Sequence, residues 1–281
     1  MTAAKLSTLV KKANKNNYAV AGLVVLGWED ALAFTQAADE SGIPIILQAG
    51  PSCRAHTPVA ILGKMFRYLA EQTKTPICCH LDHGYTFKEC KEGMDSGFTS
   101  VMFDGSKLPL NKNINISSKI AKLAQSYNVS LEGEVGIVGY NQGKVSKETN
   151  LNEAREFAQA SGVDAMAISV GNVHLQTSKI AKIDIHKIKE IETVTKIPLV
   201  LHGSSGISYV VRKKIAKTTN VAKFNIGTEL RMVAGNSLRE NFKKNKKIFD
   251  RLELIKPTIV NIKKKCKKSY IKYWTNQWVI V

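Results

Sequence analysis

The sequence has few of the features that divide a chain into separate units or place it in a membrane. Only 7 of its 281 residues are proline, and no glycine- or serine-rich linker interrupts it. A run of about 18 apolar residues, which a transmembrane helix requires, is lacking. The first residues lack the apolar stretch of a signal peptide, so we expect a cytoplasmic protein without a membrane segment. We predict a single domain over residues 1–281.

Cysteine is too irregular to supply a disulfide framework. The five cysteines are odd in number and unevenly spaced. Disulfide-stabilised domains have paired cysteines and occur in oxidising compartments. We therefore expect reduced thiols, in agreement with a cytoplasmic location.

Positive charge is abundant but concentrated near the C-terminus. Of the net charge of +18, about +10 lies in residues 243–272, which hold twelve Lys or Arg and two Asp or Glu. Helical spacing of apolar residues (Ile259, Ile262, Cys266 and Ile271) predicts a helix whose lysines face solvent. An acidic surface, a phosphorylated ligand or RNA are alternative partners for this charge. We do not expect nucleic acid to be the partner.

Short apolar, β-branched runs alternate with amphipathic stretches along most of the chain. Helical patterns lie between the runs, for example at 57–73, 112–126, 152–161 and 208–218. Strict alternation predicts parallel strands, and no dinucleotide-type glycine loop follows the first of them. We predict a (β/α)8 barrel over about 5–240, followed by a Lys-rich helical tail over about 241–281. The predicted strands are 19–26, 43–48, 77–82, 100–104, 130–135, 165–169, 199–202 and 221–225.

Polar residues recur at the ends of six of these strands, where barrels carry their chemistry. Three of them are histidines, His83, His174 and His202. Three imidazoles with an open fourth position are typical of a catalytic Zn²⁺ site. Asp82 adjoins the first histidine and is placed to move a proton, although it could instead only orient a ligand. His80, on the same strand face, is expected inside the barrel and not on the metal.

Further carboxylates face the same predicted mouth. Asp104 ends the fourth strand, and Glu132 and Glu134 share one face of the fifth because they are two residues apart. They could hold an alternate metal position or accept hydrogen bonds from the histidines. A charged barrel interior is the remaining interpretation.

Two strand-to-helix loops are suited to an anion. The loops contain small residues, hydroxyls and free backbone N–H groups, which bind phosphate well at helix N-termini. Ordinary turns are the alternative interpretation. A metal beside a phosphate site indicates a phosphorylated keto substrate whose carbonyl the metal would polarise. The loop residues are Gly203, Ser204, Ser205, Asn225, Ile226, Gly227 and Thr228.

These residues, taken in order, strongly resemble class II, zinc-dependent ketose-bisphosphate aldolases, the family of fructose- and tagatose-bisphosphate aldolases. The resemblance spans roughly residues 5–260. It is carried by CHLDHG at 79–84, DSGFTSVMFDGS at 95–106, EGEVG at 132–136, GVDA at 162–165, GNVH at 171–174, HGSSG at 202–206 and KFNIGTEL at 223–230.

The resemblance implies a TIM barrel that cleaves fructose 1,6-bisphosphate reversibly to dihydroxyacetone phosphate and glyceraldehyde 3-phosphate. It implies Zn²⁺ on His83, His174 and His202, replaceable by Co²⁺ or Mn²⁺, with Asp82 as proton donor. Asp104 and Glu134 match a second or resting metal position. The triose phosphate would bind the two loops, with a monovalent cation nearby. A homodimer or homotetramer is expected.

Several positions depart from the family pattern and bear on the sugar. Leu175 stands where glycine usually follows the second zinc histidine, and Gly50 stands where a serine is expected. The usual asparagine of the first strand is missing around Gly22. The loop after Gly136 has no acid, so the nearest later one, Glu148, is the predicted proton shuttle.

Charge alone makes Arg54 the predicted ligand of a second phosphate. The departures leave two alternatives to fructose 1,6-bisphosphate. One is tagatose 1,6-bisphosphate or another phosphorylated ketose, with the same chemistry. The other is a non-catalytic barrel that acts as a binding protein.

Overall fold

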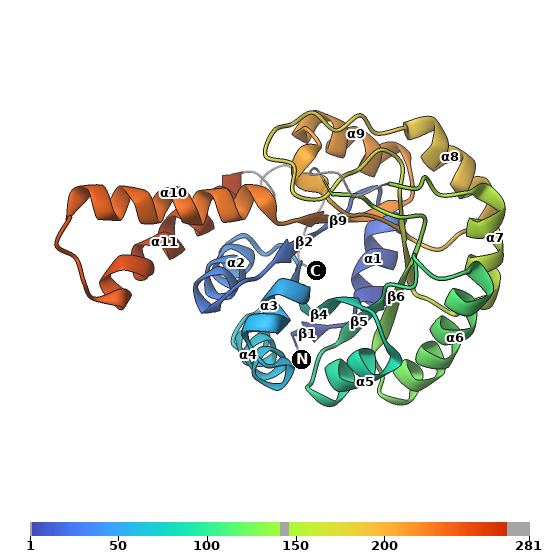
Figure 1. The fold of residues 1–281 in the computed structure, drawn as a ribbon, viewed down its shortest axis with the longest axis horizontal. Coiled ribbons are helices and arrows are strands. Elements are labelled where there is room, and N and C mark those ends of the chain that lie inside the picture. The colour runs from blue at the N-terminus through green and yellow to red at the C-terminus, as the bar shows by residue number, and fades with distance from the viewer. Residues whose placement is uncertain (1, 141–145, 269–281) are drawn as a thin grey trace.

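Eight parallel strands close into a barrel in the computed structural model, which describes residues 2–140 and 146–268 (Figure 1). The strands follow one another around the barrel, and β4 pairs with β5 to close it. The short β1 (Ala3–Ala4) adds to the start of β4. The barrel strands are β2 (Val20–Val24), β3 (Ile45–Ala49), β4 (Ile77–Gly84), β5 (Ser100–Phe103), β6 (Ser130–Val135), β7 (Ala165–Ile168), β8 (Leu199–Leu201) and β9 (Val221–Ile226).

The predicted (β/α)8 barrel is thus confirmed, and each of the eight predicted strands has a counterpart. The main difference is at the end of β4, which continues to Gly84. The β4–β5 register shifts between Leu81 and Gly84, and His83 has a φ of +52°. A left-handed backbone is uncommon for a residue other than glycine. This irregularity lies at the residue predicted to bind metal.

Helices surround the barrel, and α1 lies across one of its ends. The predicted helix 57–73 corresponds to α4, and a short helix, α3, precedes it. The two helices are separate because Pro58 favours extended backbone at Thr57, the residue before it. None of the helices in the described part of the chain has the length and apolar content needed to cross a bilayer. The helices are α1 (Leu6–Lys15), α2 (Trp28–Ser41), α3 (Pro51–His56), α4 (Val59–Glu71), α5 (Phe87–Asp95), α6 (Leu110–Ser126), α7 (Leu151–Ala160), α8 (Ile185–Val194), the 3-10 turn η1 (Ser204–Gly206), α9 (Tyr209–Thr218), α10 (Thr228–Lys244) and α11 (Arg251–Cys266).

Two apolar clusters surround the strands. The larger lies between the strands and the outer helices. In the smaller, Leu6, Leu9 and Val10 of α1 pack with inward-facing strand residues such as Ile46 and Val200. Helix α1 therefore closes the end of the barrel opposite the strand C-termini and leaves the other end for polar groups.

The Lys-rich tail packs on the barrel through a helical hairpin, in which α10 and α11 project beside α2 (Figure 1). Ile262 and Cys266 of the predicted apolar stripe are fully buried. Lys263 of α11 and Lys267, which directly follows this helix, pair with Glu40 of α2 at 2.7 and 2.9 Å. The predicted boundary near residue 240 falls inside α10, and Ile271 lies outside the described residues.

We expect Gly63→Ala to destabilise the fold. A Cβ on Gly63 of α4 would lie 2.1 Å from the backbone oxygen of Ser96, which directly follows α5. Helices α4 and α5 would therefore have to separate. Overpacking of this kind costs about 1–3 kcal/mol, and urea denaturation would measure it. The control is Gly235→Ala in α10, where the nearest atom is 3.5 Å away. Equal stability of the two variants would contradict close packing at Gly63.

Candidate active site

A cavity of about 320 Å³ opens at the C-terminal ends of the strands. Its walls contain many of the residues that the sequence predicted to be functional. Residues for which the sequence suggested no role are Val24, Pro51, Tyr85, Tyr140 and Arg231. The complete lining is Val24, Gly50, Pro51, Ser52, Asp82, His83, Tyr85, Tyr140, His174, Leu175, Gly203, Ser205, Asn225, Gly227, Thr228 and Arg231.

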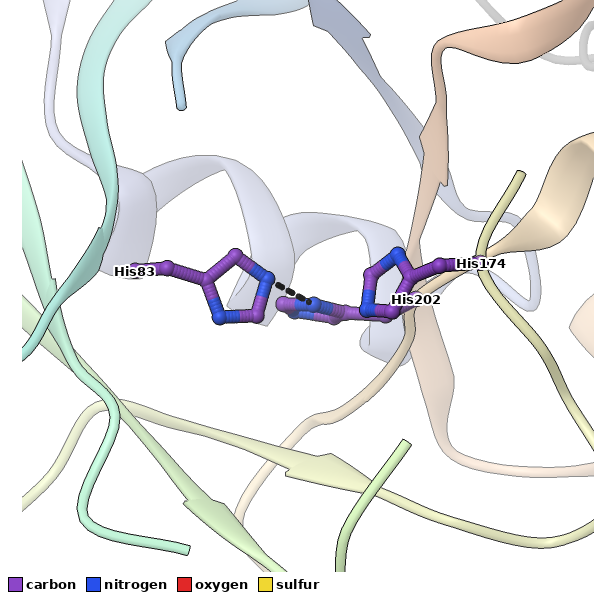
Figure 2. A group of neighbouring side chains, drawn as sticks. All are labelled: His83, His174 and His202. Atoms are coloured by element: carbon purple, nitrogen blue, oxygen red, sulfur yellow. Dashed lines mark hydrogen bonds between the residues drawn. The ribbon is translucent and has the colours of Figure 1, made fainter. Parts of the chain in front are cut away.

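Three histidines from β4, the segment after β7 and the end of β8 converge on one point (Figure 2). One ring nitrogen from each of His83, His174 and His202 lies within 4.8 Å of the others. Nε2 of His83 and Nδ1 of His202 are 2.9 Å apart. This spacing suits nitrogen ligands that share one ion.

Carboxylates orient the rings of His83 and His202, so that one nitrogen of each ring faces the point on which the three histidines converge. Nδ1 of His83 lies 2.8 Å from Oδ2 of Asp104, and Nε2 of His202 lies 3.0 Å from Oε1 of Glu132. A ring N–H that donates to each carboxylate leaves a lone pair on the facing nitrogen. Two lone pairs 2.9 Å apart repel unless a proton or a metal ion lies between them. The donor set therefore fits a divalent metal.

The electrostatic environment agrees with this fit. Burial, and after it the charge of His83, lowers the pKa of His174 and His202 to about 3, so both rings are neutral, as metal binding requires. Burial also acts to lower the pKa of His83. The negative charge of Asp82 and the other carboxylates outweighs burial and raises this pKa to about 10. The carboxylates thus favour a positive charge at this point.

Asp82 lies beside the histidines and has an unused oxygen. Its side chain is buried, and Oδ1 has no hydrogen-bond partner among the described residues. Burial acts to raise its pKa, but the charges of His83, His202 and Lys223 outweigh burial and lower it, so the carboxylate is ionised. Asp82 lines the cavity, and an ionised carboxylate there can accept a proton from a ligand.

A second group of ligand atoms shares His83 with the first. His83, Asp104 and Glu134 also bring one atom each to within 4.8 Å of the others. Oε2 of Glu134 is buried without a hydrogen-bond partner in the described structure. Burial, followed by the charge of Asp104, raises the pKa of Glu134 well above its usual value. The three residues predicted for the second metal position thus lie together, and metal binding there stays a prediction.

A buried ion pair supports the site from below. Nζ of Lys223 on β9 is 2.6 Å from Oε2 of Glu132, and both side chains are fully buried. His80 occupies the same layer, with Nδ1 2.8 Å from Oγ of Ser100 and Nε2 3.3 Å from Lys223. No role was expected for Lys223 from the sequence, although a lysine in a buried strand indicates a buried acidic partner.

Arg54 supports the backbone of the site. Its guanidinium on α3 donates to the carbonyls of Ala49, Asp82 and His83, at 2.7 Å for the first and 2.9 Å for the last. These bonds hold the strand where His83 has its left-handed backbone. Arg54 is not among the residues that line the cavity. Its role in binding a second phosphate stays a prediction, and these contacts argue against it.

The two predicted phosphate loops lie against each other. Oγ of Ser205 accepts hydrogen bonds from the N–H groups of Gly227 and Glu229, at 3.2 and 3.3 Å. Asn225 lines the cavity, and both of its side-chain polar atoms lack partners among the described residues. Ser204 and Ile226 are buried and do not line the cavity. Phosphate binding here stays a prediction, as does the monovalent cation.

Gly22 makes room for polar side chains in the position where the family's asparagine is missing. A Cβ on Gly22 would lie 1.7 Å from Oε1 of Gln48 and 2.8 Å from Oδ1 of Asn225. Gln48 on β3 is fully buried, and its amide lacks a described hydrogen-bond partner. The amide of Gln48 thus occupies space that a longer residue at position 22 would need.

Aromatic side chains line the mouth of the cavity near the loop in which the family carries an acidic proton shuttle. Tyr140 stacks on His174, with ring centroids 5.0 Å apart, and burial raises the pKa of Tyr140. Glu148 is exposed and is not among the lining residues, so its role as proton shuttle stays a prediction. Residues 141–145 of this loop lie outside the described residues.

We expect Glu132→Gln to weaken metal binding. The neutral amide would no longer stabilise the N–H of His202 and would leave Lys223 without its charged partner. Loss of such a supporting hydrogen bond typically lowers metal affinity roughly 10- to 100-fold. Competition with a chromophoric chelator for Zn²⁺ would measure it, with circular dichroism as a check on folding.

The matched control is Glu153→Gln, which removes a carboxylate paired with Lys147 at the surface. Its metal affinity should equal that of the unaltered protein. An unchanged affinity in a folded Glu132→Gln variant would show that the buried pair does not support the site.

Comparisons with known proteins agree with this geometry. The chain is 32% identical to the 6-phospho-5-dehydro-2-deoxy-D-gluconate aldolase of Shouchella clausii over 253 residues, which cover 87% of this chain and 85% of that one. It is 31% identical to the fructose-bisphosphate aldolase of Staphylococcus epidermidis over 284 residues, 98% of this chain and 99% of that one.

A solved structure is also similar. The YdjI aldolase of Escherichia coli K12 superposes with a TM-score of 0.86 at 25% sequence identity, over 98% of both chains. The sequence profile described as fructose-bisphosphate aldolase class-II matches residues 4–276. The chain therefore belongs to the class-II fructose-bisphosphate aldolase family and is a carbon–carbon lyase.

Proposed function

We propose that the protein cleaves fructose 1,6-bisphosphate reversibly to dihydroxyacetone phosphate and glyceraldehyde 3-phosphate, with Zn²⁺ bound by His83, His174 and His202. The observation that carries the proposal is the convergence of three histidine nitrogens within 4.8 Å beside the carboxylate of Asp82, which lines the same cavity. We also propose a cytoplasmic homodimer or homotetramer. The related fructose-bisphosphate aldolase, which matches 98% of this chain, supports this choice of substrate.

Each group of the site has a separate role in the proposed reaction. A bound divalent metal would polarise the ketose carbonyl. As the C3–C4 bond breaks, Asp82 accepts the proton of the C4 hydroxyl, and in the condensation direction it returns this proton to the aldehyde oxygen. The electron pair of the broken bond stays on the triose-phosphate fragment as an enediolate, which takes up a proton at C3 to give dihydroxyacetone phosphate. The N–H groups and hydroxyls of 203–205 and 225–228 hold the C1 phosphate beside the carbonyl. Tyr140 covers His174 and limits access of water to the carbonyl.

A second substrate has support from the relatives. The aldolase of Shouchella clausii acts, by its name, on a phosphorylated deoxygluconate. Cleavage of such a compound uses the same triose-phosphate half and differs in the aldehyde. Tagatose 1,6-bisphosphate is a further alternative substrate. The differences from the family pattern at Gly50 and Leu175 suggest it. A comparison of kcat/KM on the three compounds would identify the preferred one.

Removal of metal should abolish cleavage. Protein treated with a strong chelator and then freed of it should produce no triose phosphate, because nothing would polarise the carbonyl. Zn²⁺, Co²⁺ or Mn²⁺ should restore the rate, which a coupled assay for dihydroxyacetone phosphate would follow. Cleavage at an unchanged rate by protein shown by elemental analysis to be free of metal would contradict the proposal.

We expect Asp82→Ala to separate proton transfer from metal binding. Loss of a general acid–base group lowers a rate roughly 10²- to 10⁴-fold, whereas the three histidine ligands remain. Steady-state kinetics and elemental analysis on the same preparation would test both parts. Loss of the metal together with the activity would assign Asp82 a structural role instead.

A further inference from the structure

Leu175 has a backbone conformation that does not suit a leucine. It directly follows His174 and has a φ of +59°, in the left-handed region. The other described non-glycine residues with a left-handed backbone are Asn17, Asn128 and His83. Asparagine and histidine are enriched in this region, whereas a bulky apolar residue there is an outlier. Leu175 is thus an apolar residue in a conformation that usually selects glycine or asparagine, beside a predicted metal ligand.

The neighbours of Leu175 explain why the chain turns at this position. The N–H of His174 donates to the carbonyl of Gly139 at 2.8 Å, while the His174 ring points to the other two histidines (Figure 2). On the other side, the buried side chain of Gln176 packs on Gly206, where a Cβ would lie 1.8 Å from its Oε1. Because both neighbours are held, the backbone between them keeps the left-handed turn.

The fold gains little from the side chain of Leu175. It is 42% exposed and belongs to neither of the two described apolar clusters. Glycine, the usual residue of the family here, would fit the turn without strain. Strained backbone that packing does not require is typical of functional sites. Leu175 lines the cavity, so its side chain is available for contact with a ligand.

Leu175 lies next to the first of the two predicted phosphate loops. The main-chain oxygen of Val173 is so close to Gly203 that a Cβ on this glycine would lie 2.3 Å from it. Leu175, Gly203 and Ser205 all line the cavity. The leucine is therefore beside the loop that we propose to hold the C1 phosphate.

Another apolar side chain flanks the second phosphate loop. Cγ2 of Val24 lies 3.1 Å from the place that a Cβ on Gly227 would occupy, and both residues line the cavity. Neither Val24 nor Leu175 can bond phosphate oxygens, which suit the N–H groups and hydroxyls of the loops. Apolar walls beside a few polar groups are typical of small-molecule sites. These two side chains suit the carbon atoms attached to the phosphate.

We propose that the side chain of Leu175 binds the carbon atoms of the triose-phosphate half of the ketose, next to its C1 phosphate; this rests on the proposed function. Contact with the bound compound removes an exposed leucine from water, which offsets the unfavourable backbone. All the candidate substrates share this half. The contact therefore contributes to the binding of each of them and does not distinguish among their aldehyde halves.

Leu175→Gly tests the proposal through binding and stability together. Calorimetry on the zinc-loaded protein would give the Kd of dihydroxyacetone phosphate and, in an Asp82→Ala background, that of fructose 1,6-bisphosphate. Both Kd values should rise about 5- to 30-fold, because glycine has no side chain to contact the carbon atoms. The midpoint of thermal unfolding should rise by about 2–4 °C, because glycine relieves the left-handed backbone.

Two further variants separate the side chain from the backbone. Leu175→Met keeps an apolar side chain and should retain most of the affinity without a gain in stability. Leu175→Asn suits the left-handed backbone but not a carbon chain, so it should weaken binding as glycine does. The matched control is Asn17→Gly, which alters an exposed left-handed residue after α1, at the opposite end of the barrel. It should leave both Kd values unchanged.

Unchanged Kd values in the Leu175→Gly variant would overturn the proposal. A lower unfolding midpoint would also overturn it, because the leucine would then serve the fold. The proposed function fails separately: it would be overturned alone if the unaltered protein cleaved none of the three candidate substrates while Leu175→Gly still weakened the binding of dihydroxyacetone phosphate.

Discussion

The hydrogen bonds from carboxylates to histidine rings are the interactions on which the rest of the site depends. Asp104 and Glu132 fix which nitrogen of His83 and of His202 faces the cavity. An imidazole can present either nitrogen, so without these acceptors the rings would have no fixed ligand atom. The carboxylates also supply the negative charge that favours a cation at the shared point.

The layers of the barrel interior stabilise the buried charges that these hydrogen bonds involve. Helix α1 and inward apolar residues close one end. Above them, Glu132 and Lys223 neutralise each other, and His80 fills the same layer beside Ser100. Oε2 of Glu132 meets the ammonium of Lys223, and Oε1 is left to accept the N–H of His202. The lysine therefore holds Glu132 in the position that orients the His202 ring.

Two arginines near the mouth have different tasks because their surroundings differ. Arg54 lies behind the strand end, where three carbonyls take up its donors and hold the irregular backbone of His83. Arg231 lies in the cavity wall at a helix N-terminus with a buried nitrogen left over. The first holds the backbone beside His83, and the second lines the cavity.

The sequence by itself determined the barrel and the identity of the three histidines that converge at its mouth. Strand and helix periods differ, so the alternation of patterns shows where strands end, and parallel strands end on one side of a barrel. Asp82, His83 and His202 could be placed in this way because they directly follow or end strands. His174 follows its strand by a short loop and was placed by the same rule.

Only the tertiary structure decided what the long and loop-borne side chains do. A sequence shows that Arg54, Arg231 and Lys223 are charged, but not which of them finds partners across the barrel. Position along the chain gives no direction for a flexible side chain, and contacts between distant strands set its burial and its pKa. The tertiary structure therefore shows what the sequence left open for the two arginines: Arg54 holds backbone carbonyls, and Arg231 lines the cavity.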